Sequence, residues 1–196
     1  MSESWCEERS MADAEQLRGR WLGWLALASA TVGALIFVAM LRLVGTLDPS
    51  VGEIQFTFTE PAFRRILEAW GPDGQRRFAA HFAYDYPFLV CFGVFGWALG
   101  TWLAVRLEQP RWLKGVLPWL MPLAAGGDAV EDVIQQALAA AAPGSRPAVD
   151  YLLAGCAATM KWGLIALFTL IVPWAWRLVS RQEGSGRTAT AGQSGR

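Results

Sequence analysis

Four long apolar segments run through this 196-residue sequence, at residues 21–44, 84–105, 116–142 and 151–176. Crossing the hydrocarbon core of a bilayer takes about 20 apolar residues in a helix. Because lipid offers no hydrogen-bond partners, such a segment must satisfy its own backbone groups and is therefore helical. The sequence predicts an all-α fold, a polytopic bundle of four transmembrane helices over residues 21–179.

Three polar segments complete the predicted organisation. Residues 1–20 form an acidic tail, and residues 45–83 form a long loop between the first two spans. Residues 180–196 are rich in Gly, Ser, Thr and Arg. Because that composition cannot bury a core, this C-terminal tail is expected to be disordered.

The long loop is expected to contain structure of its own. After Thr59 and Pro61, apolar residues recur at helical spacing until Gly71 and Pro72: Phe63, Ile66, Leu67 and Trp70. This short amphipathic helix would lie along the outer membrane face or cover the mouth of the bundle. Just before it, residues 54–58 alternate apolar with polar, which predicts a short extended segment.

Basic residues in the short flanks of the spans predict the orientation of the chain. They lie before the first span, between the second and third, and after the fourth: Arg18, Arg20, Arg111, Lys114 and Arg177. Both termini are therefore expected to be cytoplasmic in a bacterial inner membrane, with the loop 45–83 on the extracytoplasmic side. The 17 acidic and 17 basic residues balance, so no basic surface favours nucleic acid as a partner.

Ionisable residues inside a span are costly, so each is a hypothesis about function. Four polar residues of the third span share one helix face because they follow i, i+3, i+4, i+7 spacing: Asp128, Glu131, Asp132 and Gln135. Lys161 shares a face of the fourth span with small alanines. Asp85 shares a face of the second span with Gly93, Gly96 and Gly100, where a neighbouring helix can approach closely.

These residues are the candidate site. Four inward acids against one cation favour a shared proton, which is what a general acid and base pair needs. The candidate catalytic groups are Asp128, Glu131, Asp132, Lys161 and Asp85. The candidate ligand-binding groups are Gln135, Trp162, Tyr84 and His81.

Each candidate also has a plainer interpretation. Lys161 can pair with Asp128 or Asp132 simply to lock two helices together. His81 and Tyr84 suit the membrane interface, and Trp162 suits packing. Carboxylates with His81 suit a hard cation, but their spacing matches no metal motif, so no metal and no cofactor is assigned.

Short motifs at these positions resemble a family of small, functionally uncharacterised bacterial four-helix membrane proteins. The resemblance covers residues 58–167 and rests on Ile66-Leu67-Glu68-Ala69-Trp70, Asp85-Tyr86-Pro87, Asp128 to Glu131, and Lys161-Trp162. The family tends to place Asn after the acidic pair, where this chain has Asp132. In architecture alone the chain is similar to the EXPERA membrane proteins, which include sterol isomerases and sterol-binding proteins. That similarity implies an acid-lined internal cavity for a hydrophobic ligand.

Three functions follow, in order of preference. The first is binding or transforming a small hydrophobic or lipid molecule by acid/base chemistry at the carboxylates; whether the chain is an enzyme is left open. The second is a noncatalytic module that stabilises a membrane complex, in which the buried charge cluster has only a structural role. The third is proton or ion transport, for which no broken-helix pair or repeat is present. Membrane lipids are the expected partners, and the oligomeric state is not predicted.

Overall fold

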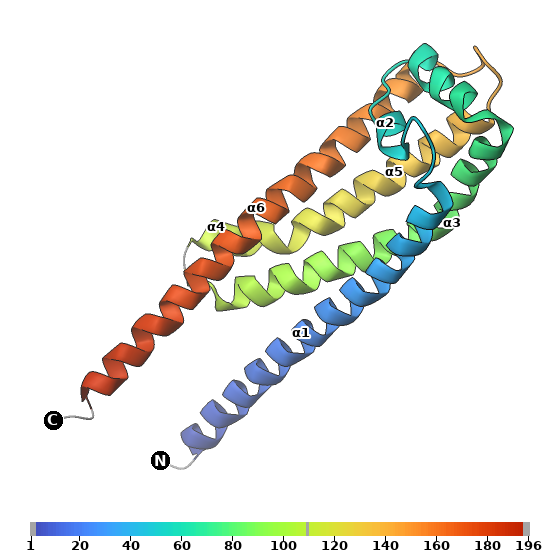
Figure 1. Ribbon diagram of the computed structural model, residues 1–196. Coiled ribbons are helices and arrows are strands. Elements are labelled where there is room, and N and C mark those ends of the chain that lie inside the picture. Colours follow the sequence, from blue (N-terminus) through green and yellow to red (C-terminus); the bar gives the residue numbers. More distant parts are fainter. Residues whose placement is uncertain (1–2, 109, 194–196) are drawn as a thin grey trace.

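The structure is a computed structural model that describes residues 3–108 and 110–193, with side chains described for 16–108 and 110–182. These residues form helices and no strand (Figure 1). The elements in chain order are α1 (Glu3–Val44), α2 (Val51–Gln55), α3 (Glu60–Arg106), α4 (Arg111–Val116), the 3₁₀ helix η1 (Leu117–Trp119), α5 (Leu120–Ala140) and α6 (Ala148–Gln193).

Within the described residues, three helical segments are long and apolar enough to cross a membrane: Gln16–Val44, Glu60–Arg106 and Ala148–Gln182. The predicted all-helical fold is confirmed, and the three segments meet the length and composition that crossing a membrane requires. The remaining predicted span corresponds largely to α5, which has 21 residues. It carries three acidic residues, Asp128, Glu131 and Asp132, and is not among these three segments.

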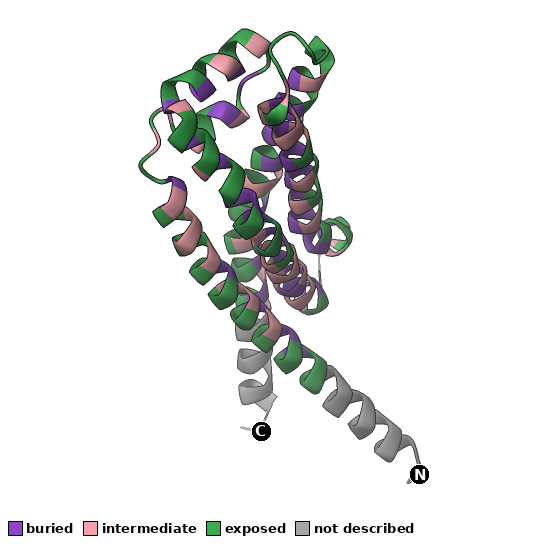
Figure 2. Ribbon diagram, turned by 90° about the vertical axis from the view of Figure 1, so that its right-hand side faces the viewer, coloured by how far each residue is buried: buried purple, intermediate pink, exposed green. Residues whose placement is uncertain are grey.

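The long helices α1, α3, α5 and α6 lie side by side (Figure 1). Helix α3 contacts α1, α5 and α6, and α5 also packs along α6. The first turns of α1 and the last turns of α6 lie at the same end of the molecule. Exposed residues cover much of the outer surface (Figure 2). Many of them are large and apolar, including Trp24, Leu35 and Leu170, as expected for surfaces that face lipid.

Glycines allow α3 to approach the 3₁₀ helix η1 and the first turn of α5 closely. A Cβ built on Gly96 would lie 2.0 Å from the Cβ of Met121, and one on Gly100 would lie 2.6 Å from the carbonyl oxygen of Leu117. Side chains at these positions would push the helices apart. The predicted role of this glycine face is therefore confirmed.

The amphipathic helix of the first loop forms the initial part of α3. Gly71 has φ 62° and ψ −175°, which separates this part from the longer helix that follows. The predicted end at Gly71 is confirmed, because a positive φ favours glycine. The four predicted apolar residues are buried in a core with Leu138 and Tyr151: Phe63, Ile66, Leu67 and Trp70. This helix covers one end of the bundle instead of lying on its outer surface.

The predicted extended segment at residues 54–58 is wrong. Residues Val51–Gln55 form α2. Its start is stabilised by a reciprocal capping interaction in which the backbone N–H of Ser50 donates to Glu53 Oε1 at 2.9 Å. Three alternating residues are too few to specify a strand, and this chain has no partner strand among the described residues.

Two predicted boundaries also differ from the structure. The third span was expected over 116–142, but α5 covers 120–140 and follows a 3₁₀ turn. Pro118 lies in that turn, where its missing N–H removes an α-helical hydrogen bond. The expected disordered tail, 180–196, is helical as far as Gln193. A composition that excludes a core does not by itself exclude a continuing helix, and residues 194–196 lie outside the described part.

Candidate functional site

An ion-pair cluster joins α6 to α5 inside the protein. Lys161 Nζ lies 2.5 Å from Asp128 Oδ1 and 2.7 Å from Glu131 Oε2. Lys161 and Glu131 are buried, with 2% and 0% of their surface exposed. Helix α6 turns Lys161 inward on the same face as Ala154 and Ala158, which are also buried. The expected contact between this lysine and the acids of α5 is present.

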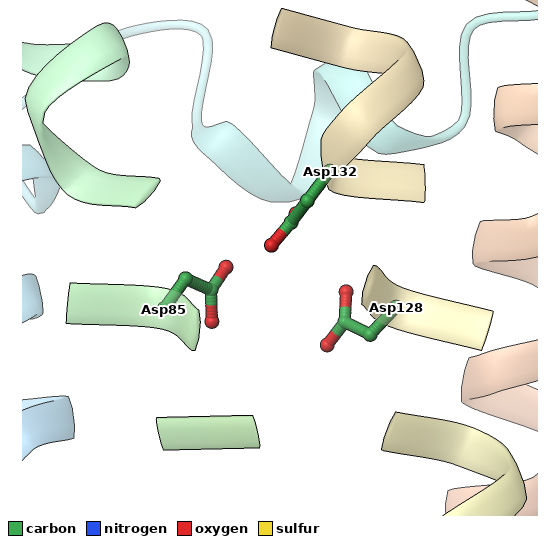
Figure 3. A group of neighbouring side chains, drawn as sticks. All are labelled: Asp85, Asp128 and Asp132. Atoms are coloured by element: carbon green, nitrogen blue, oxygen red, sulfur yellow. The ribbon is translucent and has the colours of Figure 1, made fainter. Parts of the chain in front are cut away.

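Three aspartates converge beside this ion pair (Figure 3). One carboxylate oxygen each from Asp85, Asp128 and Asp132 lies within 4.8 Å of the oxygens from the other two. Asp128 and Asp132 are one helical turn apart, so α5 presents both on the same face. Asp85 comes from α3, which packs against α5. Three like charges this close repel one another in a poorly solvated interior.

His81 and Gln135 extend the cluster at its two sides. His81 Nδ1 contacts the backbone oxygen of Phe78, and its Nε2 lies 3.8 Å from Asp85 Oδ2. Gln135 Nε2 donates a hydrogen bond of 2.6 Å to Glu131 Oε1. Both side chains are buried. His81 is thus buried beside Asp85 as part of the cluster.

A pocket of about 350 Å³ opens beside the cluster. Its wall is mainly apolar and includes four aromatic side chains, from Phe37, Phe88, Phe92 and Trp162. Four ionisable residues also line it: His81, Asp85, Asp128 and Lys161. An apolar cavity in which a few polar groups converge is the usual form of a site for a small molecule.

Helices α1 and α2 contribute much of the pocket wall that the sequence did not predict. Gly52 and Gln55 come from α2, and Phe37 and Met40 come from α1. Gln55 Oε1 accepts a hydrogen bond of 3.0 Å from Trp162 Nε1, which ties α2 to α6 at the pocket. No charged residue or motif marks these positions in the sequence, so no local signal identifies them.

The other predicted site residues do not line the pocket. Glu131, Asp132 and Gln135 are buried and are not among the residues that line it. Tyr84 is 43% exposed and does not line the pocket either. The structure therefore brings together the predicted carboxylates, Lys161 and His81, with Trp162 at the pocket wall, and leaves Tyr84 outside.

A larger groove of about 590 Å³ lies between α3 and α5, away from the ion pair. Its lining is almost wholly apolar and includes Leu89, Trp97 and Trp119. Such a groove lacks polar groups that would orient a ligand. The pocket beside the aspartates is the better candidate site.

The arrangement has clear chemical capacities. Neighbouring carboxyl groups of which one is protonated can donate and accept protons at a molecule in the pocket. Lys161 supplies a fixed positive charge next to Asp128. Carboxylate oxygens are also the ligands that hard cations prefer.

No protein-family model, no curated protein and no solved structure matches this chain. The resemblance to small bacterial four-helix membrane proteins stays a prediction.

Proposed function

We propose that this chain is a four-span integral membrane protein that binds a small hydrophobic molecule, such as an isoprenoid or another lipid, in the pocket beside Asp85 and Asp128. The observation that supports the proposal most directly is the pocket itself. A purely structural charge cluster would be surrounded by packed side chains, whereas here a mainly apolar cavity of about 350 Å³ adjoins it.

The placement of α5 supports four spans instead of three. Helix α5 packs against α3 and α6, so a bilayer that surrounds those two helices also surrounds α5. Its acids are buried, while Leu123, Val130 and Val133 are exposed on its outer face. A helix with polar residues inward and aliphatic residues outward is suited to lipid contact. Both termini would be cytoplasmic in a bacterial inner membrane, with the loop 45–83 outside.

The lining of the pocket supports a ligand that is mostly apolar with one polar end. Aromatic and aliphatic side chains from α1, α3 and α6 would bury its hydrocarbon part, among them Phe37, Phe88 and Ile165. The polar end would meet Asp85, Asp128 and Lys161. If the ligand is transformed, Asp85 and Asp128 are the groups placed to move a proton. Lys161 would stabilise the ionised form of Asp128 through their ion pair.

Mass spectrometry of the protein purified from membranes in a mild detergent tests the proposal. Extraction of the purified sample should release a small hydrophobic molecule that is enriched over bulk membrane lipid. The variant Gly52→Leu adds a side chain at the pocket wall, where a Cβ has free space apart from Ser50 Oγ at 3.7 Å. This variant should lose the enriched molecule.

Gly163→Leu provides the matched control. It adds the same side chain on α6, where a Cβ meets nothing within 4 Å and the residue does not line the pocket. It should retain the molecule as the wild type does. If no molecule is enriched, or if both variants retain it equally, the pocket is not a binding site and the charge cluster is a structural element of a membrane complex.

A further inference from the structure

The three aspartates beside the pocket have the composition and spacing of a cation site. One oxygen from each of Asp85, Asp128 and Asp132 lies within 4.8 Å of the others. Cations such as Mg²⁺, Mn²⁺ and Ca²⁺ bind oxygen ligands at roughly 2.0–2.6 Å. A single ion between the three oxygens can therefore contact all of them after small side-chain movements.

Asp132 supplies an independent indication that something is bound there. It is only 2% exposed, and its Oδ2 has no hydrogen-bond partner. Its carboxylate points into the space between Asp85 and Asp128 (Figure 3). Leaving a buried carboxylate oxygen without a partner is strongly unfavourable. A positively charged or donating partner at that point, such as a bound cation or a proton shared between the aspartates, would satisfy this oxygen.

The charged side chains around the cluster do not supply that partner. Lys161 Nζ pairs with Asp128 and Glu131. No ion pair joins Asp132 to a basic residue in the described part of the chain, and Asp85 has only the ring of His81, at 3.8 Å. If all four acids are ionised, Lys161 balances one of the four negative charges. A divalent ion balances two more.

We infer that Asp85, Asp128 and Asp132 together bind one divalent cation of the oxygen-preferring class, such as Mg²⁺, Mn²⁺ or Ca²⁺. Glu131 is not among the proposed ligands, because its oxygens do not belong to the group that converges within 4.8 Å, and its carboxylate contacts Lys161 and Gln135. Asp85 and Asp128 also line the pocket, which provides a route by which an ion can enter. The inference goes beyond the proposed function and holds whether or not a hydrophobic molecule occupies the pocket.

Binding of Mn²⁺ alone to the purified, chelator-treated protein tests the inference. Electron paramagnetic resonance of free Mn²⁺ gives the number of ions bound, and the wild type should bind one ion per chain in a saturable manner. Even partners that only orient metal ligands typically contribute about 10- to 100-fold to affinity. Asp132→Asn should therefore weaken Mn²⁺ binding by at least about tenfold.

Asp73→Asn is the matched control, since Asp73 is an exposed acid paired with Arg76 and lies outside the cluster. It should bind Mn²⁺ as the wild type does. Melting curves check each variant's fold: Mn²⁺ should raise the melting temperature of the wild type and of Asp73→Asn, and should raise that of Asp132→Asn by less. No saturable binding in the wild type, or equal binding in Asp132→Asn, would overturn the inference.

The test separates this inference from the proposed function. Gly52→Leu should keep its Mn²⁺ affinity, because Gly52 lines the pocket from α2 and is not one of the three aspartates. Absence of Mn²⁺ binding in the wild type would contradict the cation site and would not affect the copurification of a hydrophobic molecule. Conversely, failure to find such a molecule would contradict the proposed function and would leave the measured binding of Mn²⁺ unaffected.

Discussion

Lys161 of α6 and Asp128 of α5 form a buried ion pair with a separation of 2.5 Å between Nζ and Oδ1. Lys161 Nζ also lies 2.7 Å from Glu131 Oε2, so a single cation serves two carboxylates of the same helix. The pair joins two helices at the level of the pocket, and both residues line that pocket. Its removal should therefore affect stability as well as ligand binding.

Lys161→Met should destabilise the protein, because it leaves Asp128 and Glu131 buried without their cation. Removing one partner of a buried pair typically costs about 3–5 kcal/mol. Thermal or denaturant unfolding in detergent or nanodiscs measures the loss. The double variant Lys161→Met with Asp128→Asn should be less destabilised than the sum of the two single variants. Full additivity would exclude direct coupling between the two side chains.

Gly100→Ala should destabilise the packing of α3 against the 3₁₀ helix η1. The added Cβ would meet the backbone oxygen of Leu117 at 2.6 Å and Pro118 Cα at 2.9 Å. Overpacking of this kind typically costs about 1–3 kcal/mol. Gly163→Ala is the control, because its Cβ meets nothing within 4 Å, and the higher helix propensity of Ala should make it neutral or stabilising. Equal melting temperatures for the two variants would contradict the close approach.

Arg64→Gln should loosen the end of the bundle that the first loop covers. Arg64 donates a hydrogen bond of 2.8 Å to the backbone oxygen of Ala141, and it pairs with Glu60 at 3.4 Å. Glu60 Oε1 in turn accepts a bond of 2.8 Å from the N–H of Gly144. Hydrogen bonds to charged groups contribute about 1.5–3 kcal/mol. Proteolysis at residues 142–147 should become faster.

Arg65→Gln is the control for this loop, because Arg65 is the exposed neighbour of Arg64. The change removes the same charge from the same helix. Cleavage at residues 142–147 in this variant should match the wild type. If both variants are cleaved at equal rates, general loss of positive charge explains the effect, and the contact to Ala141 does not.

Cysteine labelling should decide the orientation in the membrane. In a variant without native cysteines, Asp73→Cys should react with an impermeant maleimide in intact cells, because the loop 45–83 is expected outside. Ser185→Cys should react only after the cells are permeabilised, because both termini are expected in the cytoplasm. The reverse pattern would place the basic flanks outside and contradict the proposed topology.

Much of the fold follows from patterns within single segments. Length and apolar content identify the long helices, and the spacing of Asp128, Glu131 and Asp132 places them on one face of α5. Small residues beside Lys161 and Asp85 orient these two side chains inward, as the structure confirms for both. The spacing of Phe63, Ile66, Leu67 and Trp70 identifies the covering helix, although not what it covers. Each of these properties depends on residues a few positions apart, so the sequence alone determines it.

The site itself depends on how the helices pack. Only the packing places Asp85 within 4.8 Å of Asp128 and Asp132, and separates Glu131 from the pocket by pairing it with Lys161. Only the packing brings Phe37 of α1 and Gly52 of α2 to the wall of the same pocket. The rotation and offset of one helix against another result from many weak contacts between residues far apart in the chain. No single segment carries that information, which is why the tertiary structure decided which inward-facing residues meet and where a cavity remains.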